Sequence, residues 1–174
     1  MYRAMQIANY VVHLALKKRY DVTNLHLQEI LYFLQAESLY RTKKPLFAEN
    51  IEKWRLGPVI PEVHHEYKEY GSQPIAEVAS EIIFDNETFD IKFVEFNEDD
   101  IEIETRERLK TSIITLLSKN PFELVDLTHG HTPWKRLRTR IEDGEKGLAY
   151  TNQELYEFFS KYPEELRKVL GGNS

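Results

Sequence analysis

The chain has 174 residues, of which 41% are hydrophobic and 30% are charged. A chain of this length commonly forms one domain, so we expect a single domain over residues 1–170 and a frayed tail over 171–174. Cysteine is absent, which excludes disulfides and thiolate metal sites. No segment approaches the roughly 20 apolar residues that cross a bilayer, and the N-terminus lacks a signal-peptide pattern. We therefore expect a cytoplasmic protein without a membrane partner.

The acidic charge is concentrated in one segment. The net charge is −6, and residues 77–107 hold twelve acidic residues against two basic ones, so this segment carries −10 and the remainder +4. Nucleic-acid-binding domains are more often basic overall. The segment is better suited to a basic protein surface.

The first third of the chain predicts two helices. Alanine and valine recur on one helical face from about residue 4 to residue 19, where three cations complement the end of the helix dipole. Thr23 or Asn24 can cap the next helix, in which Leu27, Ile30, Leu31 and Leu34 form an apolar stripe.

Residues 51–71 predict a strand, a bend, a helix and a stop. Ile51 to residue 54 suits a short strand, which Gly57 and Pro58 then interrupt. Pro61 suits the first turn of a helix over residues 61–70, and Gly71 is placed to end it in the left-handed conformation.

A small β element is expected near the middle of the chain. Residues 82–84 and 89–93 suit two strands separated by Asp85 and Asn86, which could pair as a hairpin with residues 51–54 as a third strand. Helical patterns then cover residues 99–117, 121–127, 134–141, 151–162 and 163–170. The expected fold is mainly α, with about seven helices and a small antiparallel β element.

Histidines are the main candidates for catalytic or metal chemistry. His64 and His65 are adjacent on a helix, so their side chains diverge by about 100°, and His129 and His131 lie in a turn where they could converge. No His-Glu-x-x-His pattern, phosphate-binding loop or dinucleotide fingerprint is present. We therefore expect no enzyme activity, no catalytic residue, no metal and no cofactor; a metal-dependent hydrolase is the remaining enzymatic hypothesis.

Four motifs occur in a fixed order. They are LHLQEILYFLQAESLY (25–40), KPLFAENIEKW (44–54), the Trp-x-x-Gly-Pro-Val block (Trp54, Gly57, Pro58, Val59) and LTHGHTPWKRLR (127–138). Together they resemble the Panacea domain, the SocA-like antitoxin family also found in phage-associated GepA-like proteins. The resemblance spans about residues 5–140. It implies an antitoxin that binds a cognate toxin directly and blocks its active surface.

The resemblance marks a set of motif positions that we expect to serve partner binding or to support the surface that does. These are Trp54, Gly57, Pro58, Val59, Tyr67, His129, Pro133 and Trp134. The chain departs from the family at Glu29, where family members commonly carry Lys. Because this position points away from the apolar stripe, we expect a change in surface charge and not in fold.

An architectural role is favoured for the block around His129. His129 could bond free carbonyls at the end of one helix, Pro133 can start the next, and Trp134 can anchor that helix in the core. If Trp134 packs against the bend at Gly57, the two motif blocks form one structural unit.

The expected toxin-binding surface lies near the Gly57-Pro58 bend and helix 61–70, with the acidic segment engaging a basic toxin face. An alternative is a DNA-binding autoregulator that meets promoter DNA through the cationic segment, Lys135, Arg136, Arg138 and Arg140. A proteolytic adaptor using the same segment and a homodimer are the other hypotheses. The cations could also neutralise the acidic segment or be solvated.

Overall fold

The computed structural model describes residues 1–84 and 91–171, and over these residues the protein is mainly helical, as predicted. The α-helices are α1 Ala4–Lys18, α2 Asn24–Thr42, α3 Pro61–Glu66, α4 Ile103–Leu117, α5 Pro121–Gly130, α6 Thr132–Lys135, α7 Arg138–Glu142, α8 Asn152–Lys161 and α9 Pro163–Leu170. The strands are β1 Ile51–Trp54, β2 Gly57–Val59, β3 Glu81–Phe84, β4 Ile91–Val94 and β5 Ala149–Tyr150.

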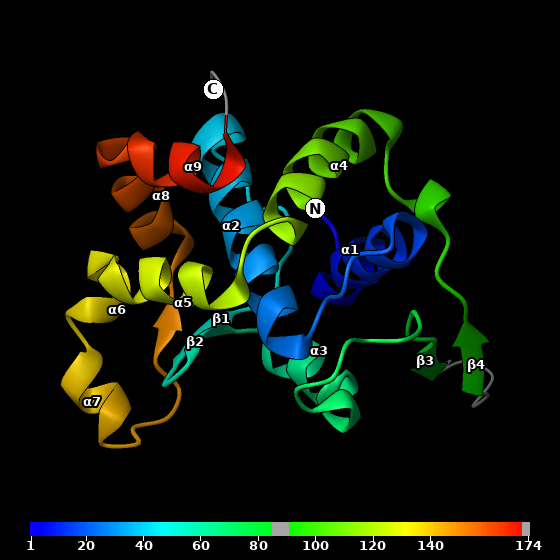
Figure 1. Ribbon diagram of the computed structural model, residues 1–174, viewed down its shortest axis with the longest axis horizontal. Coiled ribbons are helices and arrows are strands. Elements are labelled where there is room, and N and C mark those ends of the chain that lie inside the picture. The colour runs from blue at the N-terminus through cyan, green and yellow to red at the C-terminus, as the bar shows by residue number, and fades with distance from the viewer. Residues whose placement is uncertain (85–90, 172–174) are drawn as a thin grey trace.

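The central element is α2, around which the other helices are arranged (Figure 1). It contacts α1, α3 and α4 as well as α5, α8, α9 and β2. Consequently almost every residue from Asn24 to Leu39 is buried, polar ones included. The predicted apolar stripe is therefore only one of the covered faces of this helix.

The ends of the first two helices follow from local chemistry. Thr23 caps α2, because its Oγ1 accepts a hydrogen bond from the His26 backbone N–H at 3.2 Å. Lys17 and Lys18 lie in the last turn of α1, where positive charge is favourable. These two helix boundaries were predictable from sequence.

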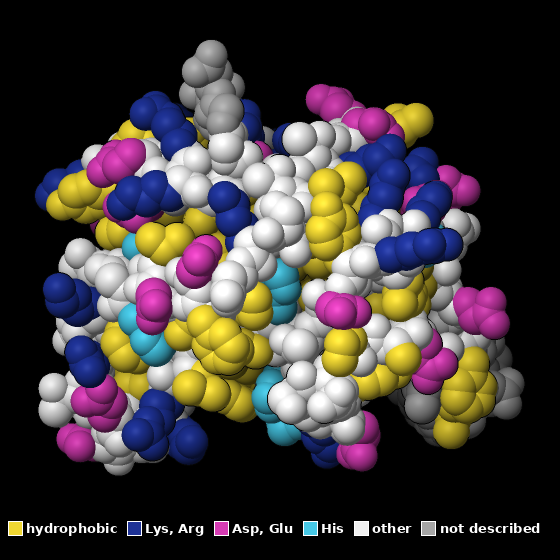
Figure 2. Space-filling view, in the orientation of Figure 1, with side chains coloured by type: hydrophobic (Ala, Val, Ile, Leu, Met, Phe, Trp, Pro, Cys, Tyr) yellow, Lys and Arg dark blue, Asp and Glu magenta, His cyan; other side chains and the backbone are white. Residues whose placement is uncertain are grey.

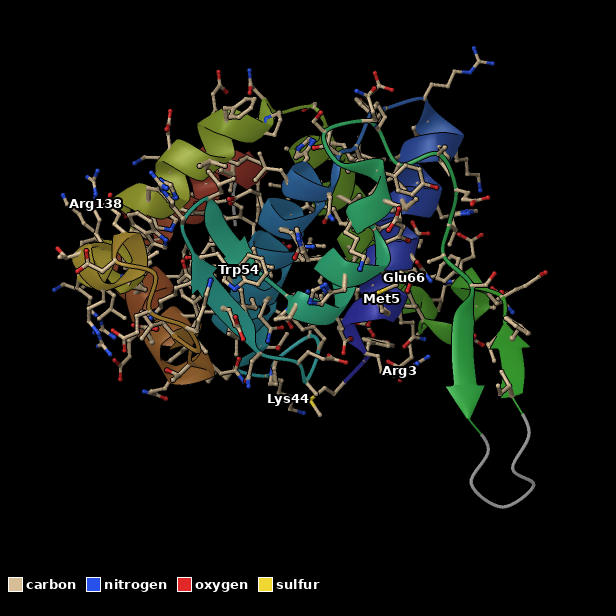
Figure 3. The ribbon with its side chains drawn as sticks, turned by 90° about the horizontal axis from the view of Figure 1, so that it is seen from below. Arg3, Met5, Lys44, Trp54, Glu66 and Arg138 are labelled. Atoms are coloured by element: carbon tan, nitrogen blue, oxygen red, sulfur yellow. The ribbon has the colours of Figure 1, made fainter. Side chains whose placement is uncertain are left out.

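The strands form two separate sheets. β1 pairs antiparallel with β2 and with β5, giving the order β2-β1-β5. β3 pairs antiparallel with β4, from Glu81 opposite Val94 to Phe84 opposite Ile91, and this hairpin projects from the helices (Figure 3). The predicted hairpin is confirmed, but the expectation that residues 51–54 extend it is wrong, because β5 and β2 occupy both edges of β1. Asp85, Asn86 and residues 89–90 lie outside the described residues.

Two predicted helices are interrupted. The helix expected over residues 61–70 consists of α3 and a 3₁₀ turn, Lys68–Tyr70, since Tyr67 leaves helical geometry with φ −96° and ψ 9°. Gly71 has the predicted positive φ of 56°, but its ψ of −119° is not left-handed helical. The cationic helix expected over residues 134–141 is divided into α6 and α7, because Leu137 takes φ −108° and ψ 6°. Trp134 and Ile141 are each buried on one of the two pieces.

In the part of the chain that the structure describes, none of the helices is both long and apolar enough to cross a membrane.

Two buried glutamines of α2 hold the loops that pass it. Gln35 Oε1 accepts hydrogen bonds from the backbone N–H groups of Leu46 (2.8 Å) and Phe47 (3.2 Å), and its Nε2 donates to the Phe47 carbonyl (3.2 Å). Gln28 Oε1 accepts from the Ile60 N–H at 2.8 Å. These amides satisfy buried backbone groups that no strand or helix serves.

Replacing the Gln35 amide is therefore expected to destabilise the fold. Gln35→Met keeps the side-chain length but leaves two buried donors unsatisfied, which costs about 2–4 kcal/mol of unfolding free energy. Urea denaturation measures the loss. The matched control is Gln153→Met, which removes an exposed amide that donates to Glu157 and should change stability by less than about 0.5 kcal/mol. Equal effects of the two substitutions would contradict this account.

Candidate functional site

The two motif blocks meet at the hairpin formed by β1 and β2. Trp54 pairs with Gly57, so Arg55 and Leu56 form a two-residue loop, which we call the hairpin tip. Both tip residues are exposed, and the Leu56 side chain is 65% exposed. Gly57 has φ +120°, a backbone conformation that glycine adopts without the strain imposed on other residues. The bend predicted at Gly57 and Pro58 is thus the return strand of a tight hairpin.

The base of the hairpin is fixed by Trp134. Its indole Nε1 donates a hydrogen bond to the Trp54 carbonyl at 3.0 Å, and the side chain is 3% exposed. This confirms the predicted contact between the blocks. Pro133 lies in the first turn of α6, as predicted.

The structural role of His129 differs from the expected one. Its ring stacks on Trp134 with centroids 3.9 Å apart and planes 15° from parallel. Its buried Nε2 has no hydrogen-bond partner among the described residues. The expectation that it bonds helix-terminal carbonyls is therefore replaced by ring stacking, and burial lowers its pKa.

Glu29 lies directly beneath the hairpin. A Cβ added to Gly57 would lie 2.4 Å from Glu29 Oε1, so only glycine leaves room for this carboxyl group. Glu29 is 0% exposed, and the expectation that it lies on the surface is wrong. The reason is that β2 and α5 cover the face of α2 opposite its apolar stripe.

The Glu29 carboxyl group is held in a nearly apolar site. Burial raises its pKa well above 4.5, and the hydrogen bond with Thr128 opposes this shift only in part. Thr128 Oγ1 lies 3.4 Å from Glu29 Oε1 and donates to the Val125 carbonyl at 3.0 Å. Because that hydroxyl has a single proton, it cannot donate to Glu29 Oε1 and to the Val125 carbonyl at the same time, so the carboxylate form gains little from it. The geometry favours the protonated acid.

The remaining motif residues are mostly interior. Gly57, Pro58 and Val59 are buried, and Tyr67 is 1% exposed, with its hydroxyl donating to Asn9 Oδ1 at 2.6 Å. Trp54 is half-buried and lies between α7 and α3 (Figure 3), with its ring 5.1 Å from that of His64. Figure 2 shows hydrophobic side chains gathered over this region, with histidines beside them. Most motif residues therefore lie beneath the surface of the protein and support it, and few of them are exposed on it.

Three of the four candidate nucleic-acid contacts are paired with carboxylates. Arg136 binds Glu154, Arg138 binds Glu142, and Arg140 binds Glu145. These partners lie in α7, α8 and the loop between them, and not in the acidic segment. Lys135 is exposed. The DNA-contact and adaptor hypotheses stay predictions, but phosphates would have to compete with these carboxylates for the arginines.

His129 and His131, which could have converged on one ion, contact different side chains. His129 packs on Trp134, whereas His131 is 3% exposed and its Nδ1 lies 3.1 Å from the Tyr32 hydroxyl. His64 and His65 have ring centroids 5.9 Å apart. Over residues 1–84 and 91–171, no group of three or more histidine or acidic side chains could hold a metal ion.

Sequence reasoning missed a buried polar cluster beside α2. Lys53 Nζ lies 2.8 Å from Glu154 Oε2 and 4.8 Å from the centre of the Tyr150 ring. Burial lowers the Lys53 pKa, which the bond to Glu154 opposes. Ile51 and Lys53 are the buried positions of β1, and the two-residue period of a strand, which puts Lys53 on the face of Ile51, was the signal available in the sequence.

Comparison with known proteins gives one match. A family model described as "Antitoxin SocA-like, Panacea domain" matches residues 27–135. The searches of curated proteins and of solved structures found no match. The matched segment runs from α2 through α6 and includes Glu29, the hairpin and Trp134.

Adding a methyl group at Gly57 should damage the fold. Gly57→Ala places a Cβ against Glu29 Oε1 at a φ of +120°, so unfolding free energy should fall by roughly 2–4 kcal/mol. Thermal and urea denaturation measure it. Gly130→Ala is the matched control, since no atom of the described residues beyond its own helix backbone and chain neighbours lies within 4 Å of its added Cβ and its helical position favours alanine by up to about 1 kcal/mol. A stable Gly57→Ala protein would refute the close contact.

The raised pKa of Glu29 predicts that the stability of the protein depends on pH. Because the folded protein holds this proton at a pH where the unfolded chain loses it, the contribution of Glu29 to stability falls as pH rises from the unfolded pKa, about 4.5, toward the folded one. Glu29→Gln keeps the shape without the charge. It should gain stability over wild type near neutral pH, and the gain should shrink on acidification. Urea unfolding across this range measures it, and a pH-independent difference would show that Glu29 does not titrate as described.

Proposed function

The chain belongs to the SocA-like antitoxin family defined by the Panacea domain, and from this membership we propose that it is the antitoxin of a toxin–antitoxin system. It neutralises a cognate toxin by direct binding and performs no catalysis. We also propose that residues 1–170 form a single domain. The observation that carries the antitoxin proposal is the hairpin tip, a two-residue loop of exposed Arg55 and Leu56 on a buried base.

The tip has the properties of a binding element. Leu56 is 65% exposed and lies two residues from the half-buried Trp54, so the loop offers an apolar side chain beside an aromatic one. Beneath it, Gly57 packs on Glu29, and Trp134 bonds to the Trp54 carbonyl. A loop held in one conformation loses little entropy on binding, so more of its contact energy appears as affinity.

Neighbouring elements extend this surface. β2 contacts α5, whose first turn carries Phe122 with 68% of the side chain exposed. His64 and the half-buried Trp54 lie on the α3 side. Aromatic side chains of this kind are common among the residues that dominate binding energy at protein interfaces.

The acidic segment supplies a second, electrostatic contribution. Asp99, Glu102 and Glu104 are exposed or nearly so around the start of α4. A negative surface attracts a basic toxin face and accelerates association at low ionic strength. A toxin face that meets nucleic acid or nucleotide would have this charge.

A charged residue at the tip should weaken toxin binding. Leu56→Asp should raise the dissociation constant at least about tenfold, because it places a charge in the apolar centre of the contact. The affinity of the purified pair and growth on co-expression with the toxin from the neighbouring reading frame measure this. The matched control is Leu16→Asp, which changes an exposed leucine, 40% exposed, in the last turn of α1 and outside both proposed contact regions.

The outcomes separate the surface from the function. Neutralisation lost by Leu56→Asp and kept by Leu16→Asp supports both. Neutralisation kept by Leu56→Asp would place the contact elsewhere. A neighbouring product that is harmless alone and does not copurify would remove the antitoxin proposal itself.

A further inference from the structure

A pocket of about 340 Å³ opens between the end of α5, the start of α6, α8 and α9. Its lining includes Asp126, His131, Phe158, Tyr162, Glu165 and Lys168. None of its lining residues belongs to the β1–β2 hairpin. Its volume lies within the range of small-molecule sites.

His131 forms the floor of this pocket. Its side chain is 3% exposed, its Nδ1 lies 3.1 Å from the Tyr32 hydroxyl, and its Nε2 has no hydrogen-bond partner in the described part of the chain. Within the same residues the Tyr32 hydroxyl bonds to no other atom, so its proton belongs in the bond to Nδ1. The hydrogen of the neutral imidazole then lies on Nε2. Burial lowers the His131 pKa to about 4, so the ring is uncharged at neutral pH.

A hydrogen-bond acceptor lies beside this donor. Glu165 Oε2 is 3.6 Å from His131 Nε2, too far for a hydrogen bond. The other carboxylate oxygen, Oε1, accepts from Lys168 Nζ at 2.6 Å. A buried N–H and a carboxylate oxygen without another hydrogen-bond partner among the described residues therefore lie 3.6 Å apart at the floor of the pocket.

Aromatic rings complete the walls. The Phe158 ring centroid lies 4.7 Å from that of His131 and 5.3 Å from that of Tyr162. Phe158 and Tyr162 are each only partly buried. Each ring therefore keeps part of its surface open, although the Lys161 ammonium lies 5.3 Å from the centre of the Tyr162 ring.

We propose that this pocket binds a nucleobase. The edge of a base carries an amino N–H beside a ring nitrogen, as in adenine, which complements Glu165 Oε2 and His131 Nε2–H respectively. Its faces stack on aromatic side chains, a contact worth a substantial part of base affinity. A carboxamide side chain offers the same two polar groups but no ring to stack. This inference does not depend on the toxin-binding surface.

Adenosine tests the proposal by calorimetric titration of the full chain. Binding with a dissociation constant below about 1 mM is expected. Purine riboside keeps the ring and loses the amino group, so it should bind at least about tenfold more weakly, because the lost hydrogen bond is to a charged acceptor. Propionamide, which carries the amide pair alone, should show no binding in this range.

Variants locate the site. Glu165→Ala removes the acceptor and should weaken adenosine at least about tenfold, whereas Glu164→Ala, an exposed neighbour on α9 that does not line the pocket, should leave affinity unchanged. Thermal denaturation confirms that both variants fold. Absence of adenosine binding, equal affinity for purine riboside, propionamide binding in the same range, or equal behaviour of the two variants would each overturn the proposal.

Discussion

The contact between a buried carboxyl group and a glycine backbone organises this protein. Glu29 lies in the second turn of α2 with no exposed surface, and its Oε1 lies where any Gly57 side chain would be. The hairpin can therefore approach α2 only because residue 57 is glycine. Burying an acid costs free energy unless it is neutral or paired, so the close packing and the raised pKa of Glu29 are two consequences of one constraint.

The other residues of the family motifs pack around this contact. Thr128 links α5 to the carboxyl group, Trp134 bonds to the Trp54 carbonyl, and His129 stacks on Trp134. The most characteristic residues of the family resemblance are thus largely interior. Such a scaffold can keep one architecture while its exposed loop residues fit different partners. This separation is consistent with an antitoxin family, in which the surface and not the core must match the toxin.

The basic residues that follow Trp134 form ion pairs with nearby carboxylates. Arg136, Arg138 and Arg140 have carboxylate partners close by, and Lys53 reaches Glu154 in the interior. The acidic segment, in contrast, exposes many of its carboxylates. Some of these also lie beside cations, Asp99 by Arg106 and Glu107 by Lys110, but the segment keeps a formal charge of −10, which is the reason for proposing a basic partner.

The sequence by itself determined the features that depend on neighbouring residues. Thr23 and Thr151 cap their helices through side-chain oxygens, Asn120 accepts from Phe122, and prolines begin α3, α5 and α9. The hairpin of β3 and β4 followed from alternation and turn residues. Each of these signals acts within a few positions, so propensity and capping were sufficient to predict them.

Only the tertiary structure decided the rest. Glu29 reads as a surface residue until β2 and α5, the latter about 100 residues away in sequence, cover it. The same is true of His131, which meets Tyr32 across a separation of 99 residues, and of β1, whose partners are β2 and the distant β5. A single helix periodicity records one buried face, whereas α2 is enclosed on several sides. Which faces are covered depends on packing between distant segments, and that information is not contained in any local pattern.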